Sequence, residues 1–339
     1  MYTFKNTEQN NQKASEYETK SLLYLLCMRK DSKDIDVLMI DCFNDVTGGN
    51  DSLDALWDVQ SKGVKSLRPK TVGVALVTLF KNYFSQIEFN HYILFIPKLR
   101  EGYLNDESLT TYSINNFKDE CVFKIKEGLC TEFIKRNKDD DLKIVEIEDF
   151  LSKVTFVVAD TEKENYTKNI VNFKNKDIKS KKFFIELFDE IRDMQTALKN
   201  NCIEGITISS VKDVLNFNRV IKKNDLEVVT INRLIGIDIF NKNNIPFEFL
   251  CEIKELNKDD VKDIIQDCNE SLSRTLFNKD SKEEFWTFME KVVKVVKDNP
   301  KKSSRKLFNM IPRKVIKRVH TLDEISCIYF ISLVQEGLL

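Results

Sequence analysis

The sequence predicts an α/β core in the N-terminal half of the chain, followed by a mainly α-helical C-terminal domain. Short β-rich runs alternate with helical periodicity as far as residue 160, and helical periodicity dominates after it. Nine glycines and five prolines are few for 339 residues, which favours long helices over an all-β sandwich. At this length two domains are expected, and we place them at residues 14–160 and 161–339.

The N-terminal core is expected to run helix, strand, strand, helix, strand. Its first two strands read as a hairpin around Thr47-Gly48-Gly49-Asn50-Asp51, a strong turn signal. The third strand is expected beside the second, because a crossover helix connects them. The expected bounds are a helix at 14–29, strands at 35–46 and 54–63, a helix at 71–87, a strand at 91–96, a helix at 115–137 and a strand at 154–159.

The C-terminal half carries mostly helical periodicity. One short run near residues 245–253 reads as a strand. The expected helices are at 165–173, 181–199, 211–221, 258–277 and 282–296.

Composition excludes several classes of protein. No segment approaches the roughly 18 consecutive apolar residues of a membrane span. The eight cysteines form no Cys-x-x-Cys pair, which argues against a zinc site. Scattered thiols without a secretory signal predict a cytoplasmic protein. Because 53 basic residues nearly cancel 54 acidic ones, the overall charge gives no sign of a nucleic-acid partner.

The most specific chemical pattern is a polar ladder on the expected strand at 54–63. Because side chains alternate along a strand, Asp58, Gln60 and Lys62 lie on one face. Asp45, at the end of the preceding strand, can reach the same point, and Glu18 on the first helix can supply a further carboxylate. Hard oxygen ligands hold Mg²⁺, and a cation near the attacking water or the phosphate assists hydrolysis. The pattern predicts a metal-dependent phosphodiesterase site.

A second interpretation of the same ladder stays open. Alternating polar residues are typical of the solvent face of an edge strand. The helix expected after this strand counts against that interpretation, because it should cover the strand.

These residues resemble the PD-(D/E)xK nuclease superfamily, in the Gln-x-Lys variant that Mrr-like restriction enzymes use. More narrowly, residues 14 to about 160 resemble the double-stranded-DNA nuclease domain of bacterial anti-phage effectors, found in CD-NTase-associated effectors and in the nuclease subunit of Lamassu systems. The sequence departs from that family at Asp41, where Glu is commoner, and at Ser61, where a hydrophobic residue is usual. The matching features are Glu18, Asp41 with Asn44-Asp45-Val46, Gln60-Ser61-Lys62, Lys70-Thr71 and a helix from Val72 to Ile87.

The resemblance implies a restriction-endonuclease-like core, a mixed sheet flanked by helices, that cuts double-stranded DNA with Mg²⁺ or Mn²⁺. It implies that Asp45, Gln60 and Glu18 are the metal ligands and Lys62 the catalytic lysine, with Asp41 and Asp58 as secondary candidates. It also implies a defence complex, such as one with an SMC-like ATPase, that restrains the nuclease. The alternative is a catalytically degenerate adaptor with a nuclease fold that binds DNA or partner proteins.

Two basic segments are candidates for contact with a DNA backbone. The first is the loop after Gly63, with Lys65, Arg68 and Lys70. The second is residues 301–318, where eight basic residues occur without an acidic one. A solvated helical face or a docking surface for an acidic protein would explain this second segment equally well. Its candidate DNA-binding residues are Arg313, Lys314, Lys317 and Arg318.

Overall fold

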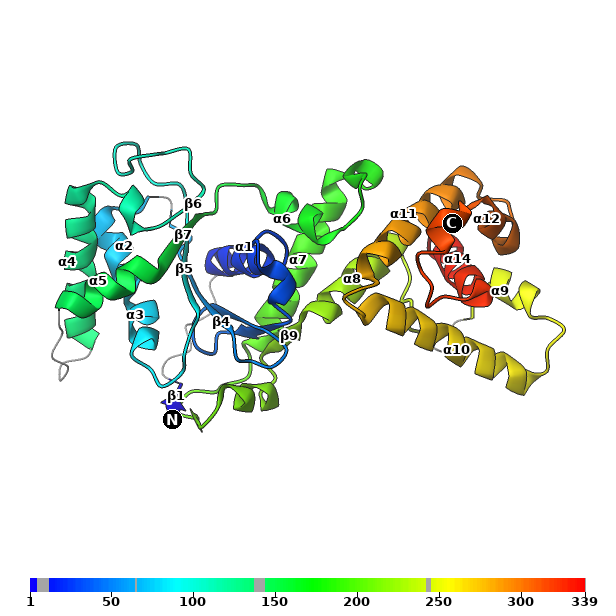
Figure 1. Cartoon of the computed structure of the whole chain (residues 1–339), viewed down its shortest axis with the longest axis horizontal. Helices are drawn as coiled ribbons and strands as arrows, with labels where there is room; N and C mark the ends of the chain where they lie inside the picture. The colour runs from blue at the N-terminus through cyan, green and yellow to red at the C-terminus, as the bar shows by residue number, and fades with distance from the viewer. Residues whose placement is uncertain (5–11, 65, 137–143, 242–244, 339) are drawn as a thin grey trace. The chain divides into compact units, whose positions relative to one another are not determined.

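A computed structural model describes residues 1–4, 12–64, 66–136, 144–241 and 245–338 (Figure 1). The chain forms two compact units: residues 1–170 with 181–226 make unit 1, and residues 171–180 with 227–339 make unit 2. This division differs from the predicted boundary at residue 160, because residues 181–226 pack with the N-terminal core.

Unit 1 is built on a mixed sheet of seven strands. The strands β4, β5 and β7 run parallel, and each other strand is antiparallel to its neighbours. The expected pairing of the strand at 91–96 with the strand at 54–63 is confirmed. In spatial order the strands are β6 (Thr111–Tyr112), β7 (Val154–Val158), β5 (His91–Ile96), β4 (Leu56–Ser61), β3 (Val46–Gly49), β2 (Val37–Ile40) and β9 (Val220–Lys222).

Helices cover both faces of this sheet, as Figure 1 shows. All residues of β2, β3 and β4 are buried, as expected for strands in the middle of a covered sheet. One face carries α1 (Gln12–Cys27), α6 (Lys163–Ile170) and α7 (Lys181–Leu198). The other carries α2 (Pro69–Ala75), α3 (Val77–Tyr83), α4 (Asp119–Arg136) and α5 (Ile144–Lys153).

The predicted turn at 47–51 was misplaced. Thr47, Gly48 and Gly49 lie within β3, and the turn between β2 and β3 spans residues 41–45 instead. The two glycines serve close packing: a Cβ on Gly48 would lie 3.3 Å from Ile35, and one on Gly49 would lie 2.5 Å from Leu53. Residues 41–45 close the turn because the Asp41 N–H donates to the Asp45 carbonyl at 3.1 Å.

The predicted helix at 211–221 was also wrong. Residues Val211–Asn216 form a short 3₁₀ helix, and β9 follows it and pairs with β2. That pairing satisfies the backbone groups along the outer edge of β2. Local periodicity could not reveal the pairing, because β2 lies about 180 residues earlier in the chain.

Two further elements differ from expectation. The helix expected at 71–87 breaks at Leu76 into α2 and α3. The strand expected near 245–253 is instead a short helix, α9 (Phe247–Glu252), which begins after Pro246. Short apolar runs suit either a buried strand or a buried helix, so their pattern alone is ambiguous.

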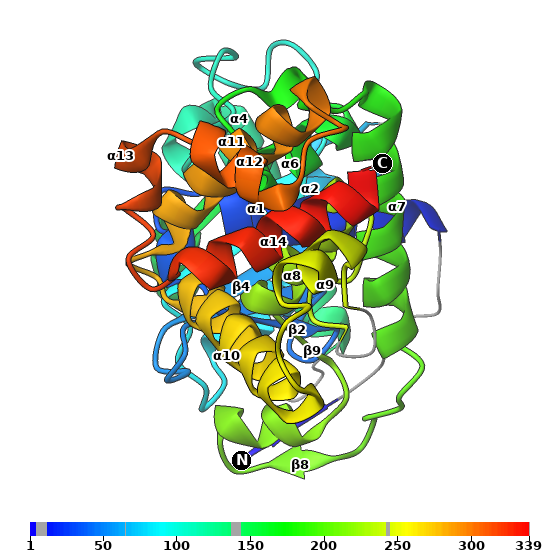
Figure 2. The ribbon, with the colours of Figure 1, turned by 90° about the vertical axis from the view of Figure 1, so that its right-hand side faces the viewer.

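Unit 2 is helical and packs around α14 (Glu324–Leu338). Residues 326–335 of α14 are all buried, as expected for a helix that is apolar on every side. Figure 2 shows α14 crossing between α10 and α12, and α9 and α11 also contact it. The other helices are α8 (Lys223–Ile235, which begins in unit 1), α10 (Lys258–Phe277), α11 (Lys282–Asp298), α12 (Ser304–Met310) and α13 (Arg313–Ile316).

Small elements complete the chain. Strand β1 (Tyr2–Thr3) pairs with β8 (Thr207–Ile208) as a separate two-stranded sheet in unit 1. Single-turn 3₁₀ helices lie at Ser32–Asp34, Ile114–Asn116 and Lys176–Ile178. Within the described ranges, no helix combines the length and the apolar character needed to cross a bilayer.

Candidate active site at the β2–β3 turn

Asp45 lies at the end of the β2–β3 turn, beside the last residues of β4. One of its carboxylate oxygens, Oδ2, accepts hydrogen bonds from the Gln60 side-chain amide, the Ser61 N–H and the Ser61 hydroxyl, each at 2.7 Å. Burial nevertheless raises the pKa of Asp45, and the nearby Lys62 charge and the Ser61 hydrogen bonds act against that rise. The carboxylate is therefore fixed in orientation by the strand that carries Gln60.

Glu18 reaches the same region from α1. Its side chain is buried, and the Lys199 ammonium donates a hydrogen bond to its Oε2. Burial and the negative charge of Asp45 raise the pKa of Glu18 to about 7, against the opposing effect of Lys199. The charge of Asp45 acts on Glu18, so the two carboxylates lie near one another, which is common where proteins bind metals or catalyse reactions.

Lys62 directly follows β4 and keeps the strand direction, because its N–H donates to the Phe95 carbonyl at 2.9 Å. Its positive charge lowers the pKa of Asp45, so the ammonium lies near that carboxylate. Within the described ranges no ion pair engages Lys62. An ammonium that is close to a carboxylate but not committed to it remains available to a phosphate or a water molecule.

Asp41 is placed differently from the other candidates. Its Oδ2 accepts a hydrogen bond from Arg219 at 3.0 Å, and Arg219 is fully buried. The same guanidinium donates to the carbonyls of Asp41, Lys199 and Asn201. Asp41 therefore anchors the turn, and its charge is balanced by Arg219.

Asp58, two residues before Gln60 on β4, is hydrogen-bonded to α3 rather than to Glu18, Asp45 or Lys62. It is fully buried, and the Asn82 side chain donates to its Oδ2 at 2.7 Å. Burial raises the pKa of Asp58 to about 7. Asn82 also donates to the Phe43 carbonyl at 3.1 Å. Asn82 therefore connects Asp58 on β4 to the β2–β3 turn, which contains Phe43.

The edge-strand interpretation of the polar ladder is excluded. Strand β4 lies between β3 and β5, and all six of its residues are buried. The polar residues of β4 therefore face packed protein and the candidate site.

The oxygen atoms gathered here suit a hard divalent cation. Three oxygen atoms of the site accept no hydrogen bond from the described residues: Glu18 Oε1, Asp45 Oδ1 and Gln60 Oε1. The other carboxylate oxygen of Glu18 and of Asp45 does accept hydrogen bonds. No group of three or more His, Cys, Asp or Glu side chains that could hold a metal occurs in the part of the chain that is described. The fit therefore depends on the Gln60 amide as a third ligand, and an all-oxygen set favours Mg²⁺ or Mn²⁺ over Zn²⁺.

The predicted DNA-binding residues are dispersed. Arg68 and Lys70 are exposed at the start of α2, and Lys70 pairs with Glu127; Lys65 lies outside the described residues. In unit 2 the basic side chains on and after α13 are exposed, and none forms an ion pair with the described residues. These are Arg313, Lys314, Lys317 and Arg318.

Three residues of the site were not predicted from the sequence as parts of it. Ser61 was noted only as a departure from the family pattern, and Lys199 and Arg219 lie more than 130 residues beyond Gln60. No local motif marks these two, because their contacts depend on the packing of α7 and β9 against the core.

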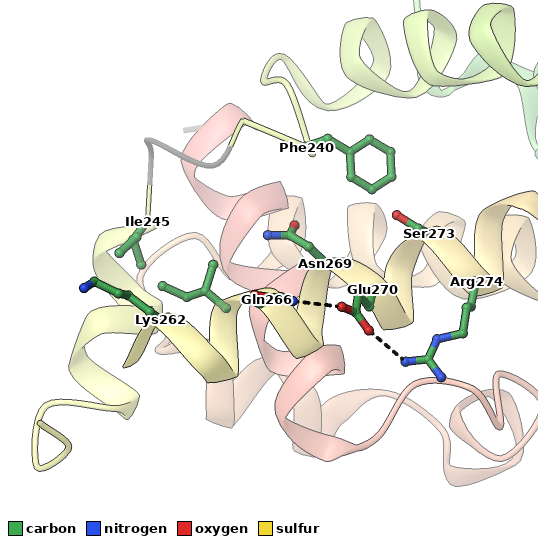
Figure 3. Close-up of a pocket in the computed structure, with 9 residues that line it drawn as sticks. Phe240, Ile245, Lys262, Gln266, Asn269, Glu270, Ser273 and Arg274 are labelled. Atoms are coloured by element: carbon green, nitrogen blue, oxygen red, sulfur yellow. Dashed lines mark hydrogen bonds and ion pairs between the residues drawn. The ribbon is translucent and has the colours of Figure 1, made fainter. Parts of the chain in front are cut away.

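Unit 2 contains a separate cavity of about 670 Å³ along α10 (Figure 3). Its carboxylate, Glu270, accepts hydrogen bonds from Gln266 at 3.1 Å and from Arg274 at 3.4 Å. The cavity brings together no carboxylate pair and no buried cation among the described residues, so it does not offer the chemistry found in unit 1. Its lining consists of Phe240, Ile245, Lys262, Ile265, Gln266, Asn269, Glu270, Ser273 and Arg274.

Comparison with known proteins finds no matching family model, no matching curated protein and no matching solved structure.

Proposed function

We propose that the protein is a metal-dependent double-stranded-DNA endonuclease of the PD-(D/E)xK type, with Gln-x-Lys in its motif. The observation that carries this proposal is the gathering of Glu18, Asp45, Gln60 and Lys62 from three separate elements. The order of helix, three antiparallel strands, helices and a parallel strand also agrees with what the resemblance implies.

Each side chain has a distinct role in this proposal. Asp45, Gln60 and Glu18 would hold a Mg²⁺ or Mn²⁺ ion, which supplies Lewis-acid activation of the phosphate and of a bound water. The ammonium of Lys62 would orient the attacking water and stabilise negative charge on the phosphate as it develops. Ser61 keeps Asp45 in place through two hydrogen bonds.

The wider role follows the resemblance. The nuclease would act in the cytoplasm as the effector of an anti-phage system, restrained within a complex by a partner such as an SMC-like ATPase. Restraint is physically reasonable, because an unrestrained nuclease would cut the DNA of its own cell. The basic side chains on and after α13 would contribute sequence-independent contacts to phosphates.

A plasmid-nicking assay with Mg²⁺ or Mn²⁺ tests the proposal. Lys62→Ala and Asp45→Asn should each lower the cutting rate by about 10²-fold or more, because each removes a group that acts on the reacting phosphate. Lys33→Met and Asp51→Asn change exposed residues of the same types and should leave the rate unchanged.

The alternative function, a degenerate adaptor, predicts a different result. It would leave DNA intact in the free protein and in its activated complex, while binding to DNA or to the partner persists. The amide at Gln60 favours this alternative, because most PD-(D/E)xK enzymes use a carboxylate at that place. Equal cutting by the wild type and by the Lys62 and Asp45 variants would also count against the nuclease.

A further inference from the structure

A lysine from a distant part of the chain lies inside the candidate metal site. Lys199 comes directly after α7, and its ammonium donates to Glu18 Oε2. The two side chains are 14% and 6% exposed, so this ion pair is shielded from water. Surface lysines are rarely so confined, because their long side chains are mobile and strongly hydrated.

The backbone around Lys199 is fixed on two sides. Its carbonyl accepts a hydrogen bond from Arg219 at 3.1 Å, and Arg219 also donates to the Asp41 carboxylate at the start of the turn. One turn earlier on α7, Gln195 accepts a hydrogen bond from Thr19 on α1 at 2.8 Å. The position of Lys199 is thus set by the same contacts that hold the turn and α1.

When Glu18, Asp45 and Asp41 are all ionised, their charges are balanced without a metal ion. Glu18 and Asp45 are matched by Lys199 and Lys62, and Asp41 is matched by Arg219. A divalent cation would therefore give the site an excess of two positive charges. DNA phosphates would compensate that excess, so metal and DNA should each strengthen the binding of the other.

We propose that Lys199 is a positioning residue that orients Glu18 and weakens divalent-cation binding until DNA phosphate is present. The inference rests on the proposed function, because it assumes that Glu18 and Asp45 are metal ligands. The flexible side chain of Lys199 would turn away from Glu18 when the cation binds, toward the phosphate that accompanies it.

Mn²⁺ titrations followed by electron paramagnetic resonance test this proposal on the full-length protein. Lys199→Gln removes the charge but keeps an N–H donor, so Mn²⁺ affinity without DNA should rise on the order of tenfold. Lys199→Arg keeps the charge and should bind Mn²⁺ as the wild type does. Asp45→Asn lacks a proposed ligand and should not bind Mn²⁺ at this site, so its titration gives the background of nonspecific Mn²⁺ binding.

A second measurement repeats these Mn²⁺ titrations with DNA present. Adding a short DNA duplex should raise the Mn²⁺ affinity of the wild type above the background of Asp45→Asn with the same duplex. The same duplex should change the affinity of Lys199→Gln much less. Chemical denaturation confirms that each variant is folded.

The outcomes separate the two proposals. Equal Mn²⁺ affinity of the wild type and Lys199→Gln, or no effect of DNA on the wild type, overturns the role of Lys199 and leaves the nuclease proposal standing. If neither protein binds Mn²⁺ above the Asp45→Asn background, the metal site itself is refuted, and the role of Lys199 falls with it.

Discussion

At the scale of single residues, Ser61 differs from the nuclease family that the sequence resembles, and in this structure it holds Asp45 in place. The Gln-x-Lys motif usually has a hydrophobic residue in its middle, yet Ser61 uses both its N–H and its hydroxyl to hold Asp45. A hydrophobic residue would keep only the backbone hydrogen bond. The hydroxyl therefore adds support to the carboxylate that we propose as a metal ligand.

Replacing Ser61 with alanine tests this support. The loss of one hydrogen bond to a ligand should lower DNA cleavage at limiting Mg²⁺ by about 10- to 100-fold, and a higher Mg²⁺ concentration should restore part of it. The measurement is the cutting rate as a function of Mg²⁺ concentration. Ser66→Ala, in the exposed loop nearby, serves as the control. An unchanged Mg²⁺ dependence in Ser61→Ala would contradict the role.

The buried Asp58 gives a prediction about pH. Burial raises its pKa in the folded protein from 3.8 to about 7, so the folded state binds its proton more tightly than the unfolded state does. Stability from this group is therefore present below about pH 4 and declines as the pH rises to about 7, by at most about 1.4 kcal/mol per pH unit.

Asp58→Asn replaces the titratable carboxyl group with an amide, whose oxygen can still accept a hydrogen bond from Asn82. Between about pH 4 and 7, the free energy of unfolding of the variant should fall less steeply than that of the wild type. Urea denaturation at several pH values measures the free energy of unfolding of both proteins. Glu18, whose pKa is also raised, is present in both, so its contribution cancels in the difference between them. The exposed Asp51→Asn should follow the wild-type curve. Parallel curves for Asp58→Asn and the wild type would show that Asp58 is ionised in the folded protein.

At the scale of secondary-structure elements, two glycines set how closely α2 and α4 approach. A Cβ on Gly73 would lie 2.0 Å from the Ile125 carbonyl oxygen, and one on Gly128 would lie 2.1 Å from the Lys70 carbonyl oxygen. These contacts are with backbone atoms, which cannot move aside as side chains do. The two helices touch through their backbones, and α2 follows directly on the loop after Lys62.

Gly73→Ala should therefore lower the free energy of unfolding by about 3 kcal/mol, because the helices must separate to admit one methyl group. Urea denaturation monitored by circular dichroism measures the change. Thr71→Ala, at an exposed position on the same helix, should change stability by less than about 0.5 kcal/mol. A stable Gly73→Ala variant would mean that the helices can shift apart at little cost.

The elements that were predicted correctly have strong local signals. The strand at 91–96 and the helix at 258–277 were found at their observed bounds. A short apolar run closed by Pro97 marks the strand, and a helical period sustained over 20 residues marks the helix. Asp45, Gln60 and Lys62 could be predicted as neighbours because adjacent strands bring together residues close in sequence. Lys199 could not, since it meets Glu18 across 181 positions of sequence through the packing of α7 on α1.

At the scale of the whole molecule, the candidate site and the exposed basic side chains on and after α13 belong to different units. Unit 1 includes residues 181–226, which supply Lys199, Arg219 and an edge strand to the sheet that carries the site. A domain that ended at residue 160 would lack the partners of Glu18 and Asp41. Unit 2 contains the exposed basic side chains on and after α13 instead.

If these side chains contact DNA phosphates, changing all four to alanine should weaken binding equally for every DNA sequence. The slope of log affinity against log salt concentration should become shallower by about 0.9 for each phosphate that the variant no longer neutralises, up to about 3.6 for four phosphates. The measurement is fluorescence anisotropy of a labelled duplex, made in EDTA so that no cleavage occurs. The matched control changes four exposed lysines of α10 and α11, namely Lys258, Lys262, Lys291 and Lys294, and should leave the slope unchanged. An unchanged slope in the variant with altered Arg313, Lys314, Lys317 and Arg318 would contradict contact of this surface with DNA, because removing a cation that neutralises a phosphate must reduce the number of counterions released on binding.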